Sequence, residues 1–226
     1  MQHTLAFDVY GTLIDTNGVI LTLQKMVGDK AAEFSRVWRE KQLEYSFRRG
    51  LMQRYRNFSV CTREELDYTC TILQVDLGNA DRNMLMDTYR VLPAFGDVAE
   101  ALKQLDKPAY RLYAFSNGQT EAVRGLLEHA GILDCFIDIV SVDEVKRFKP
   151  DPAVYQHMLK RCGSTPDSTW LISSNPFDIL GARSAGVRGI WLQRSATSIF
   201  DPWDDLAADA TISLLTQLDA AIQNCR

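Results

Sequence analysis

Short apolar runs, three of which end in Asp, Ser or Asn, constrain the fold of this chain more than any other feature. The runs cover residues 5–7, 110–115, 136–140, 170–172 and 189–192. Each has the length and composition of a buried strand. Helical patterns separate the later runs, and strands that alternate with helices are typical of parallel sheets with right-handed crossovers. We therefore predict an α/β fold with a doubly wound parallel sheet.

The helix that follows Asp151 is the clearest of those between the later strands. Asp151 is a suitable N-cap, and Pro152 stands at the first helical position. Val154, Met158 and Cys162 share one face, and Gly163 marks the end. A second helix is predicted over residues 123–130, where Gly131 is the stop signal.

The segment from residue 16 to residue 92 has a different pattern. It contains long helical patterns and no convincing strand, and Thr62-Arg63-Glu64-Glu65 has the form of a capping box at the start of a helix. Pro93 marks the return to the strand pattern. We predict a catalytic core of residues 1–15 and 93–226, with an all-helical cap inserted at residues 16–92.

Composition and charge exclude several classes of protein. The chain has 226 residues and a net charge of −4, and a negative net charge does not indicate binding to nucleic acid. It shows neither a secretory signal nor a run long enough to cross a bilayer, so we expect no membrane partner. The five cysteines are scattered and the three histidines lack metal-ligand spacing. We expect a cytoplasmic protein with reduced thiols, no bound metal and no cofactor.

Polar side chains follow the predicted strands at the points where ligands bind in open parallel sheets. Asp8 ends the first run, Asn117 follows the second, Lys149 lies beyond the third, and Asp178 follows the fourth. Any one of them could instead be a helix cap or a surface residue. As a set, they are better explained by convergence on one site.

Four segments in this order resemble the motifs of the haloacid dehalogenase superfamily, and the resemblance covers nearly the whole chain. It implies a Rossmann-like core. Residues 38–45 also resemble the cap helix of the L-2-haloacid dehalogenases within that superfamily. The segments are Asp8-Val-Tyr-Gly-Thr-Leu, Ser116-Asn117-Gly118, Lys149-Pro150-Asp151 and Ser173-Ser174-Asn175-Pro-Phe-Asp178.

Two positions separate the dehalogenases from the magnesium-dependent phosphatases that dominate the superfamily. The phosphatases carry a second Asp two residues after the nucleophile, where this chain has Tyr10. A phenol, with an ordinary pKa of about 10, is a poor acid at neutral pH. They also carry a metal-binding Asp where this chain has Ser174, so one hard oxygen ligand is missing. We therefore predict a dehalogenase, with a small-molecule phosphatase and a non-catalytic binding protein as the alternatives.

The resemblance implies a role for each residue in a two-step reaction. Asp8 attacks a small (S)-2-haloalkanoic acid and forms an ester with inversion, and Lys149 keeps Asp8 ionised. Hydrolysis of the ester then gives the (R)-2-hydroxyalkanoic acid, with Asp178 as the general base. The implied halide cradle is Arg39, Asn117 and Phe177; the implied apolar pocket is Tyr10, Leu43 and Phe58; Ser173 and Asn175 position Asp178 or the water; and Thr12, Ser116 and Tyr155 orient the nucleophile or bind the substrate carboxylate.

Arg39 is a candidate site residue even without the resemblance, because it shares a helix face with Leu43 and Phe47. A cation there either reaches water or points into a pocket. Glu40, the next residue, would weaken anion binding if it faced inward, and we expect it to face outward. The expected partners are a small haloacid and the released halide, and a homodimer is compatible with the aromatic residues of the cap.

Overall fold

A computed structural model describes residues 2–225, apart from the side chain of Asp204. Its centre is a six-stranded sheet in which every pair of neighbours is parallel, in the order β3-β2-β1-β4-β5-β6. The strands are β1 His3–Asp8, β2 Tyr110–Ser116, β3 Asp138–Ser141, β4 Thr169–Ser173, β5 Arg188–Leu192 and β6 Ala210–Ile212. The predicted α/β class with a doubly wound parallel sheet is confirmed.

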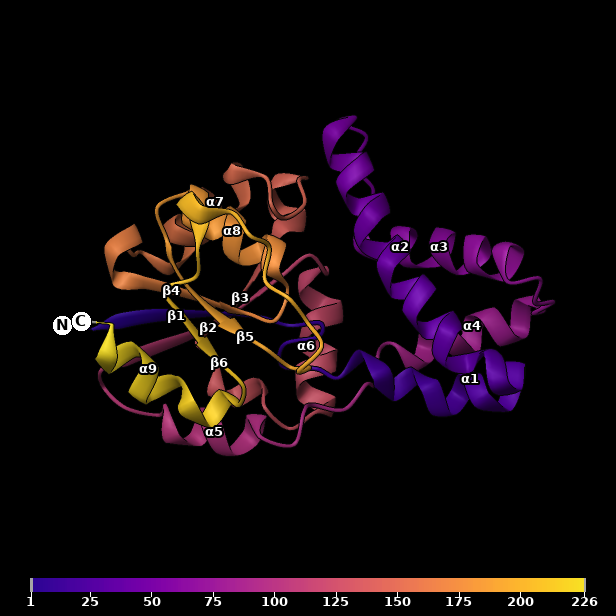
Figure 1. The fold of residues 1–226 in the computed structure, drawn as a ribbon, viewed down its shortest axis with the longest axis horizontal. Helices are drawn as coiled ribbons and strands as arrows, with labels where there is room; N and C mark the ends of the chain where they lie inside the picture. Colours follow the sequence, from indigo (N-terminus) through magenta and orange to yellow (C-terminus); the bar gives the residue numbers. More distant parts are fainter. Residues whose placement is uncertain (1, 226) are drawn as a thin grey trace.

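Helices cover both faces of this sheet (Figure 1). Because successive side chains of a strand point to opposite faces, Leu5 and Phe7 of β1 pack into one core and Ala6 into another. The first core includes residues of α5, α6 and α9, and the second includes residues of α7 and α8. These helices are α5 Val98–Gln104, α6 Thr120–His129, α7 Pro152–Cys162, α8 Pro176–Ser184 and α9 Leu218–Asn224.

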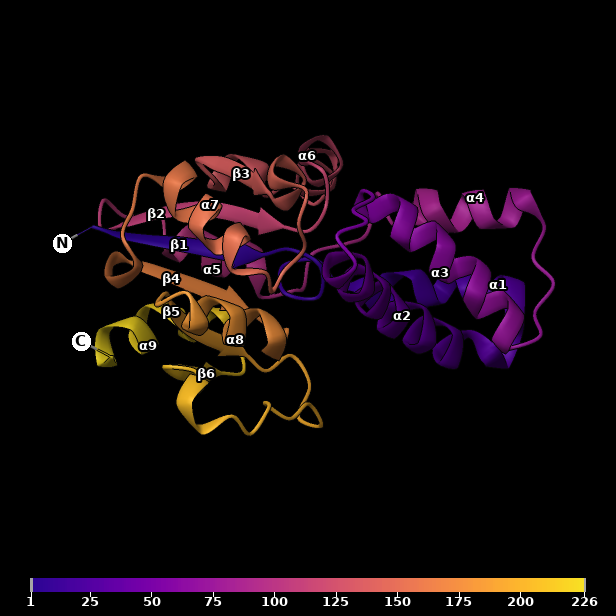
Figure 2. The same ribbon diagram turned by 90° about the horizontal axis from the view of Figure 1, so that it is seen from above.

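Four further α-helices lie between β1 and α5 and form a separate helical lobe beside one end of the sheet (Figure 2). Among the described residues, every element from Thr16 to Thr88 is helical. The chain enters and leaves the lobe through one narrow crossing, where the Asp15 N–H donates to the Pro93 carbonyl at 2.8 Å. The α-helices of the lobe are α1 Ile20–Val27, α2 Ala31–Leu51, α3 Phe58–Ile72 and α4 Asn79–Thr88.

The cap of α3 corrects one prediction. Thr62 does not start a helix, because α3 already begins at Phe58 and Asn57 is its N-cap. The Asn57 side chain accepts from the Val60 N–H at 3.1 Å, while the Thr62 hydroxyl donates back to the Phe58 carbonyl at 2.9 Å. Inside a helix the same Ser/Thr-x-x-Glu sequence pattern does not form a cap, because the backbone N–H groups that it would bind are already paired within the helix.

Other boundaries are closer to expectation. Asp151 caps α7 by accepting from the Ala153 N–H at 2.8 Å, and Gly163 ends it with a φ of 57°. The third strand begins at Asp138 rather than at residue 136. Strand β6 was not predicted, since three residues at the edge of the sheet are too few to show a pattern. No helix in the described part of the chain has the length and apolar character needed to cross a bilayer.

Candidate active site

Asp8 occupies the point where the strand order reverses. Strand β1 is flanked by β2 on one side and β4 on the other, so the loops after these strands diverge to opposite faces and leave a crevice. Asp8 is the last residue of β1 and is 7 % exposed. Its carboxylate therefore projects from the centre of the sheet into a largely enclosed site.

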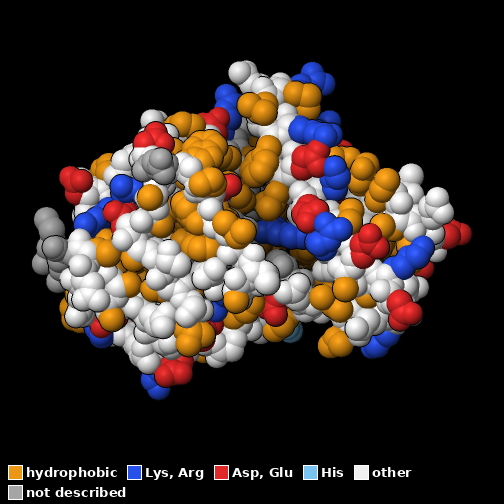
Figure 3. Space-filling model, in the orientation of Figure 1, with side chains coloured by type: hydrophobic (Ala, Val, Ile, Leu, Met, Phe, Trp, Pro, Cys, Tyr) orange, Lys and Arg blue, Asp and Glu red, His pale blue; other side chains and the backbone are white. Residues whose placement is uncertain are grey.

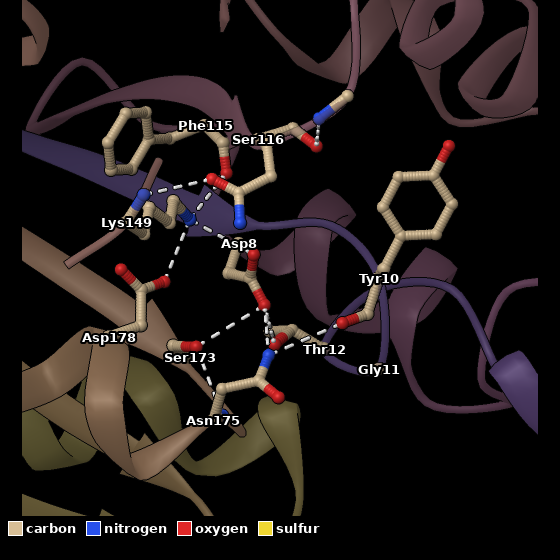
Figure 4. Close-up of polar contacts among 12 residues, drawn as sticks. Asp8, Tyr10, Gly11, Thr12, Phe115, Ser116, Lys149, Ser173, Asn175 and Asp178 are labelled. Carbon is tan, nitrogen blue, oxygen red and sulfur yellow. Dashed lines mark hydrogen bonds and ion pairs between the residues drawn. The ribbon is translucent and has the colours of Figure 1, made fainter. Parts of the chain in front are cut away.

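Four side chains donate to the Asp8 carboxylate (Figure 4). Oδ2 accepts from the Asn175 amide at 2.7 Å, the Thr12 hydroxyl at 2.8 Å and the Ser173 hydroxyl at 3.3 Å. Oδ1 accepts from the Lys149 ammonium at 3.0 Å. Ser173 and Asn175 thus contact Asp8, whereas the resemblance implied that they position Asp178 or the water. Donors to the charged form of a carboxylate favour that form and fix its orientation.

Lys149 links two carboxylates in the interior. Its Nζ lies 3.0 Å from Asp8 and 2.8 Å from Asp178, and it also donates to the Phe115 carbonyl at 2.9 Å. Burial alone would lower the pKa of Lys149, but the charges of Asp178 and Asp8 outweigh it and raise the pKa above its ordinary value. The two carboxylates therefore favour the charged form of Lys149.

Asp178 is fully buried beside that cation. Its Oδ1 accepts from the Tyr155 hydroxyl at 2.8 Å, and its Oδ2 accepts from Lys149. Burial raises the pKa of Asp178, Lys149 opposes this effect, and the nearby charge of Asp8 adds to it, so that the pKa is raised overall. Tyr155 thus contacts Asp178 and makes no described hydrogen bond to the predicted nucleophile.

Arg39 reaches the site from α2 of the helical lobe. One guanidinium nitrogen donates to the Tyr10 carbonyl at 3.2 Å, and the other donates to Gln42 Oε1 at 3.2 Å. Glu40, in contrast, is exposed and pairs with Arg36 at 2.9 Å, which confirms that it faces outward. The cation on this helix therefore points inward at the loop after β1, while the adjacent anion points to water.

Apolar side chains of both lobes form the walls around this site. A groove of about 430 Å³ is lined by Phe47, Phe148 and Phe177. The ring centroids of Phe47 and Phe177 lie 5.0 Å apart. Figure 3 shows hydrophobic side chains gathered in the hollow between the lobes. A smaller cavity of about 140 Å³ is lined by Tyr10 and Phe58.

Three other predicted site residues, Ser116, Asn117 and Leu43, lie near the site without a hydrogen bond to Asp8 in the described part of the chain. Asn117 accepts from the Lys149 backbone N–H at 3.1 Å, and the Ser116 hydroxyl accepts from the Gly118 N–H at 3.0 Å. Within residues 2–225 neither side chain has a hydrogen bond to Asp8. Leu43 is half-buried on the same side of α2 as Arg39, but it lines neither of the two cavities described above.

Two residues that support the nucleophile loop were not predicted for that purpose. Arg194 donates to the Thr12 carbonyl at 2.7 Å and pairs with Asp97 at 2.7 Å. The Ser174 hydroxyl donates to the Gly11 carbonyl at 2.7 Å, and its N–H donates to the Thr12 hydroxyl at 2.9 Å. No sequence signal marks Arg194, because it lies 182 residues from Thr12 along the chain.

The donor set does not resemble a magnesium site. Over residues 2–225, no three His, Cys, Asp or Glu side chains lie close enough together to hold a metal ion. The Tyr10 ring points away from the Asp8 carboxylate (Figure 4). Burial is the main reason why the pKa of Tyr10 is raised to about 12, so this phenol is a weaker acid than in water. Tyr10 and Ser174 therefore supply neither the acid nor the carboxylate ligand that the magnesium-dependent phosphatases have at these two positions.

Comparison with known proteins finds dehalogenases among the relatives of this chain. The family model for haloacid dehalogenase-like hydrolases matches residues 3–186. An (S)-2-haloacid dehalogenase of Pseudomonas sp. strain YL is 37% identical over 191 residues, which are 84% of this chain and 82% of that protein. A haloacetate dehalogenase of Moraxella sp. strain B is 35% identical over 85% of this chain and 86% of its own length.

Solved structures agree with the sequence relatives. The L-2-haloacid dehalogenase of Xanthobacter autotrophicus superposes with a TM-score of 0.90 over 99% of both chains, at 29% identity. A second structure of that enzyme, with chloropropionic acid covalently bound, superposes equally well at 28% identity. By its sequence and by its fold, this chain belongs to the haloacid dehalogenase-like hydrolase family.

Proposed function

We propose that this protein is a metal-independent hydrolase that converts small (S)-2-haloalkanoic acids to (R)-2-hydroxyalkanoic acids through an ester on Asp8. One observation carries the proposal. The Asp8 carboxylate is held by four donors, one of them the buried cation Lys149, while Tyr10 and Ser174 occupy the positions that phosphatase chemistry would need. Such a carboxylate is an oriented anionic nucleophile.

In the first step an Asp8 oxygen attacks C2 of the substrate from the side opposite the halogen. The carbon–halogen bond breaks, and its electron pair leaves with the halide. Halide is a stable anion and needs no proton, but it needs positive charge and N–H donors around it. Arg39 supplies the charge, with Asn117 and the positive ring edge of Phe177 completing the cradle.

In the second step water attacks the Asp8 carbonyl carbon, and the bond between that carbon and the ester oxygen breaks. The bond between C2 and the former Asp8 oxygen stays intact, so C2 is inverted once, the product leaves with that oxygen, and Asp8 takes a replacement oxygen from water. Asp178 accepts a proton of the attacking water and passes it to the departing alkoxide. Its raised pKa favours this role, and Lys149 and Tyr155 hold it in place.

The helical lobe is proposed to act as a cap over residues 1–15 and 93–226. It supplies Arg39 and one wall of the apolar groove, and both support this role. Leu43 and Phe58 of the lobe, with Tyr10, are proposed to contact the alkyl part of the substrate. Five free cysteines suit a reducing cytoplasm. The cytoplasmic location and the homodimer stay predictions.

Halide release provides a direct test. Purified protein should release chloride from (S)-2-chloropropionate in the presence of EDTA, and an Asp8→Asn variant should release none. A matched control is Asp15→Asn, which changes a carboxylate outside the site. Release of phosphate from small phosphate esters only when magnesium is added, with no halide from any haloacid, would show the phosphatase alternative to be correct.

A labelling experiment tests the covalent step. One turnover in heavy-oxygen water should place the label in the peptide that contains Asp8, as detected by mass spectrometry, and leave the hydroxyacid unlabelled. Label in the hydroxyacid instead would mean that water attacks C2 directly, and the ester would be abandoned.

A further inference from the structure

Arg194 is a partly buried cation to which the proposed reaction assigns no task. It follows β5 by two residues, and its side chain is 12 % exposed. A guanidinium can only donate hydrogen bonds, so a cation in such a place needs acceptors for its N–H groups. The acceptors of Arg194 lie on two segments that are far from it in the chain.

The first acceptor is the backbone carbonyl of Thr12. Arg194 Nη2 donates to it at 2.7 Å, and Nε donates to it at 3.1 Å. Over residues 2–225, no backbone N–H group donates to this carbonyl. Hydrogen bonds from a charged donor are about twice as strong as those between neutral groups. Arg194 therefore fixes the backbone of Thr12 from outside the loop.

The Thr12 side chain carries this constraint to the nucleophile. Its hydroxyl has one hydrogen and two acceptors within reach, Asp8 Oδ2 at 2.8 Å and Ser174 Oγ at 3.2 Å. Because a β-branched side chain is stiff about χ1, the hydroxyl moves with the Thr12 backbone. A shift of that backbone would turn the hydroxyl from Asp8 towards Ser174, and the nucleophile would lose a donor.

The second acceptor is Asp97, on the segment that returns from the helical lobe. Nη1 of Arg194 contacts both carboxylate oxygens, at 2.7 and 2.8 Å, and Asp97 also accepts from the Leu215 N–H at 2.6 Å. The guanidinium lies over the Phe95 ring, 4.2 Å from its centroid. The Phe95 N–H in turn donates to the Leu13 carbonyl at 3.0 Å. Arg194 thus joins the loop after β1 to the segment that follows the crossing between the lobes.

We propose that Arg194 is a positioning residue that acts through Thr12 on Asp8. It holds the loop after β1 against the segment 93–97, so that the Thr12 hydroxyl stays on the Asp8 carboxylate. Catalysis depends on such placement, because a displacement of about 1 Å can cost a factor of about a hundred in rate. This inference rests on the proposed dehalogenation, in which Asp8 is the nucleophile.

The first test compares Arg194→Met with Arg194→Lys. Arg194→Met keeps an apolar stem over Phe95 and removes every N–H donor of the side chain. It should lower kcat for (S)-2-chloropropionate about tenfold and leave KM within about twofold, because Arg194 orients the nucleophile and lines neither of the two cavities at the site. Arg194→Lys keeps one cationic nitrogen for the Thr12 carbonyl and Asp97 together, and should recover part of the lost kcat.

A double-mutant cycle tests the route through Thr12. Thr12→Val keeps the shape of the side chain and removes the hydroxyl that donates to Asp8. If Arg194 acts through this hydroxyl, adding Arg194→Met to Thr12→Val should lower kcat by less than about twofold. General damage to the site would instead lower kcat by the same factor in both backgrounds.

Arg183 provides a matched control for damage to the fold. It too is a partly buried arginine that pairs with an aspartate, Asp209, at 2.9 Å, and Asp209 accepts from the Gly189 N–H at 2.7 Å. This pair lies where β5 begins, at the edge of the sheet opposite to Asp8. Arg183→Met should lower the midpoint of thermal unfolding by an amount similar to Arg194→Met and leave kcat unchanged.

Two results would overturn the inference. One is a kcat for Arg194→Met within about twofold of the wild type. The other is the full loss of about tenfold when Arg194→Met is added to Thr12→Val. If Arg194→Met does not fold, Arg194→Lys must show a loss of kcat that disappears in the Thr12→Val background. A wild type that releases no halide would refute the proposed dehalogenation itself, before any variant is compared.

Discussion

Glu65 should give the unfolding free energy a pH dependence that a Glu65→Gln variant lacks. Because the side chain is fully buried on α3, the carboxyl has a pKa of about 9 in the folded protein and an ordinary value of 4.5, which applies to the unfolded chain. Between these values the folded protein holds a proton that the unfolded chain has released. The stability contributed by the protonated carboxyl is thus complete below pH 4.5 and is lost progressively as the pH rises to about 9.

The size of the effect follows from this difference. Each pH unit within the window costs the folded state about 1.4 kcal/mol relative to a side chain that does not titrate. From pH 6 to pH 8, the stability advantage of Glu65→Gln over the wild type should therefore grow by about 2.7 kcal/mol.

Urea unfolding at both pH values measures this growth. The comparison requires a single cooperative transition with equal m-values for both proteins. Glu64→Gln serves as the matched control, since that side chain is partly exposed and its advantage should change by less than about 0.5 kcal/mol. A constant difference between Glu65→Gln and the wild type would mean that Glu65 is already ionised in the folded protein at pH 6, and the reasoning from burial would be refuted.

Three further substitutions test the buried part of the site. Lys149→Met leaves Asp8 and Asp178 without their cation and should lower kcat at least about a hundredfold and stability by about 3–5 kcal/mol, measured by halide release and urea unfolding. Tyr155→Phe removes one donor to Asp178 and should cost about 1–3 kcal/mol of stability; an unchanged midpoint would contradict the hydrogen bond. Gly181→Ala places a Cβ 2.7 Å from the Pro150 Cβ and against the Tyr155 hydroxyl, and should destabilise by about 1–3 kcal/mol in thermal unfolding, whereas Gly125→Ala, in open space, should not.

The core of the fold and its reactive centre were predictable from local patterns. Asp8 ends β1, Lys149 lies in the segment after β3 and Asp178 lies shortly after β4, and parallel strands of one sheet bring their carboxyl ends to one edge. Helical spacing places Arg39 on the face of α2 that carries Leu43 and Phe47, but it leaves the direction of the cation open, and only the resemblance favoured the inward one.

Local patterns were less informative where a motif depends on its neighbours. Thr62 has the sequence pattern of a capping box, yet the N-cap of the helix is Asn57, five residues before the predicted one, and its side chain accepts from the Val60 N–H. Strand β6 exists only because β5 offers a free edge for pairing, and its own three residues carry no signal.

Strand and helix periodicity and the order of the motifs are properties of the chain, so the sequence alone predicts the class of fold and the candidate reactive side chains. Tertiary structure alone decided which groups touch. Ser173 and Asn175 bind Asp8, Tyr155 binds Asp178, and Arg194 braces the Thr12 carbonyl, and the burial of Glu65 belongs with these contacts. The physical reason is that hydrogen bonding and desolvation depend on distances of a few ångströms between residues far apart in the chain, and no local pattern encodes those distances.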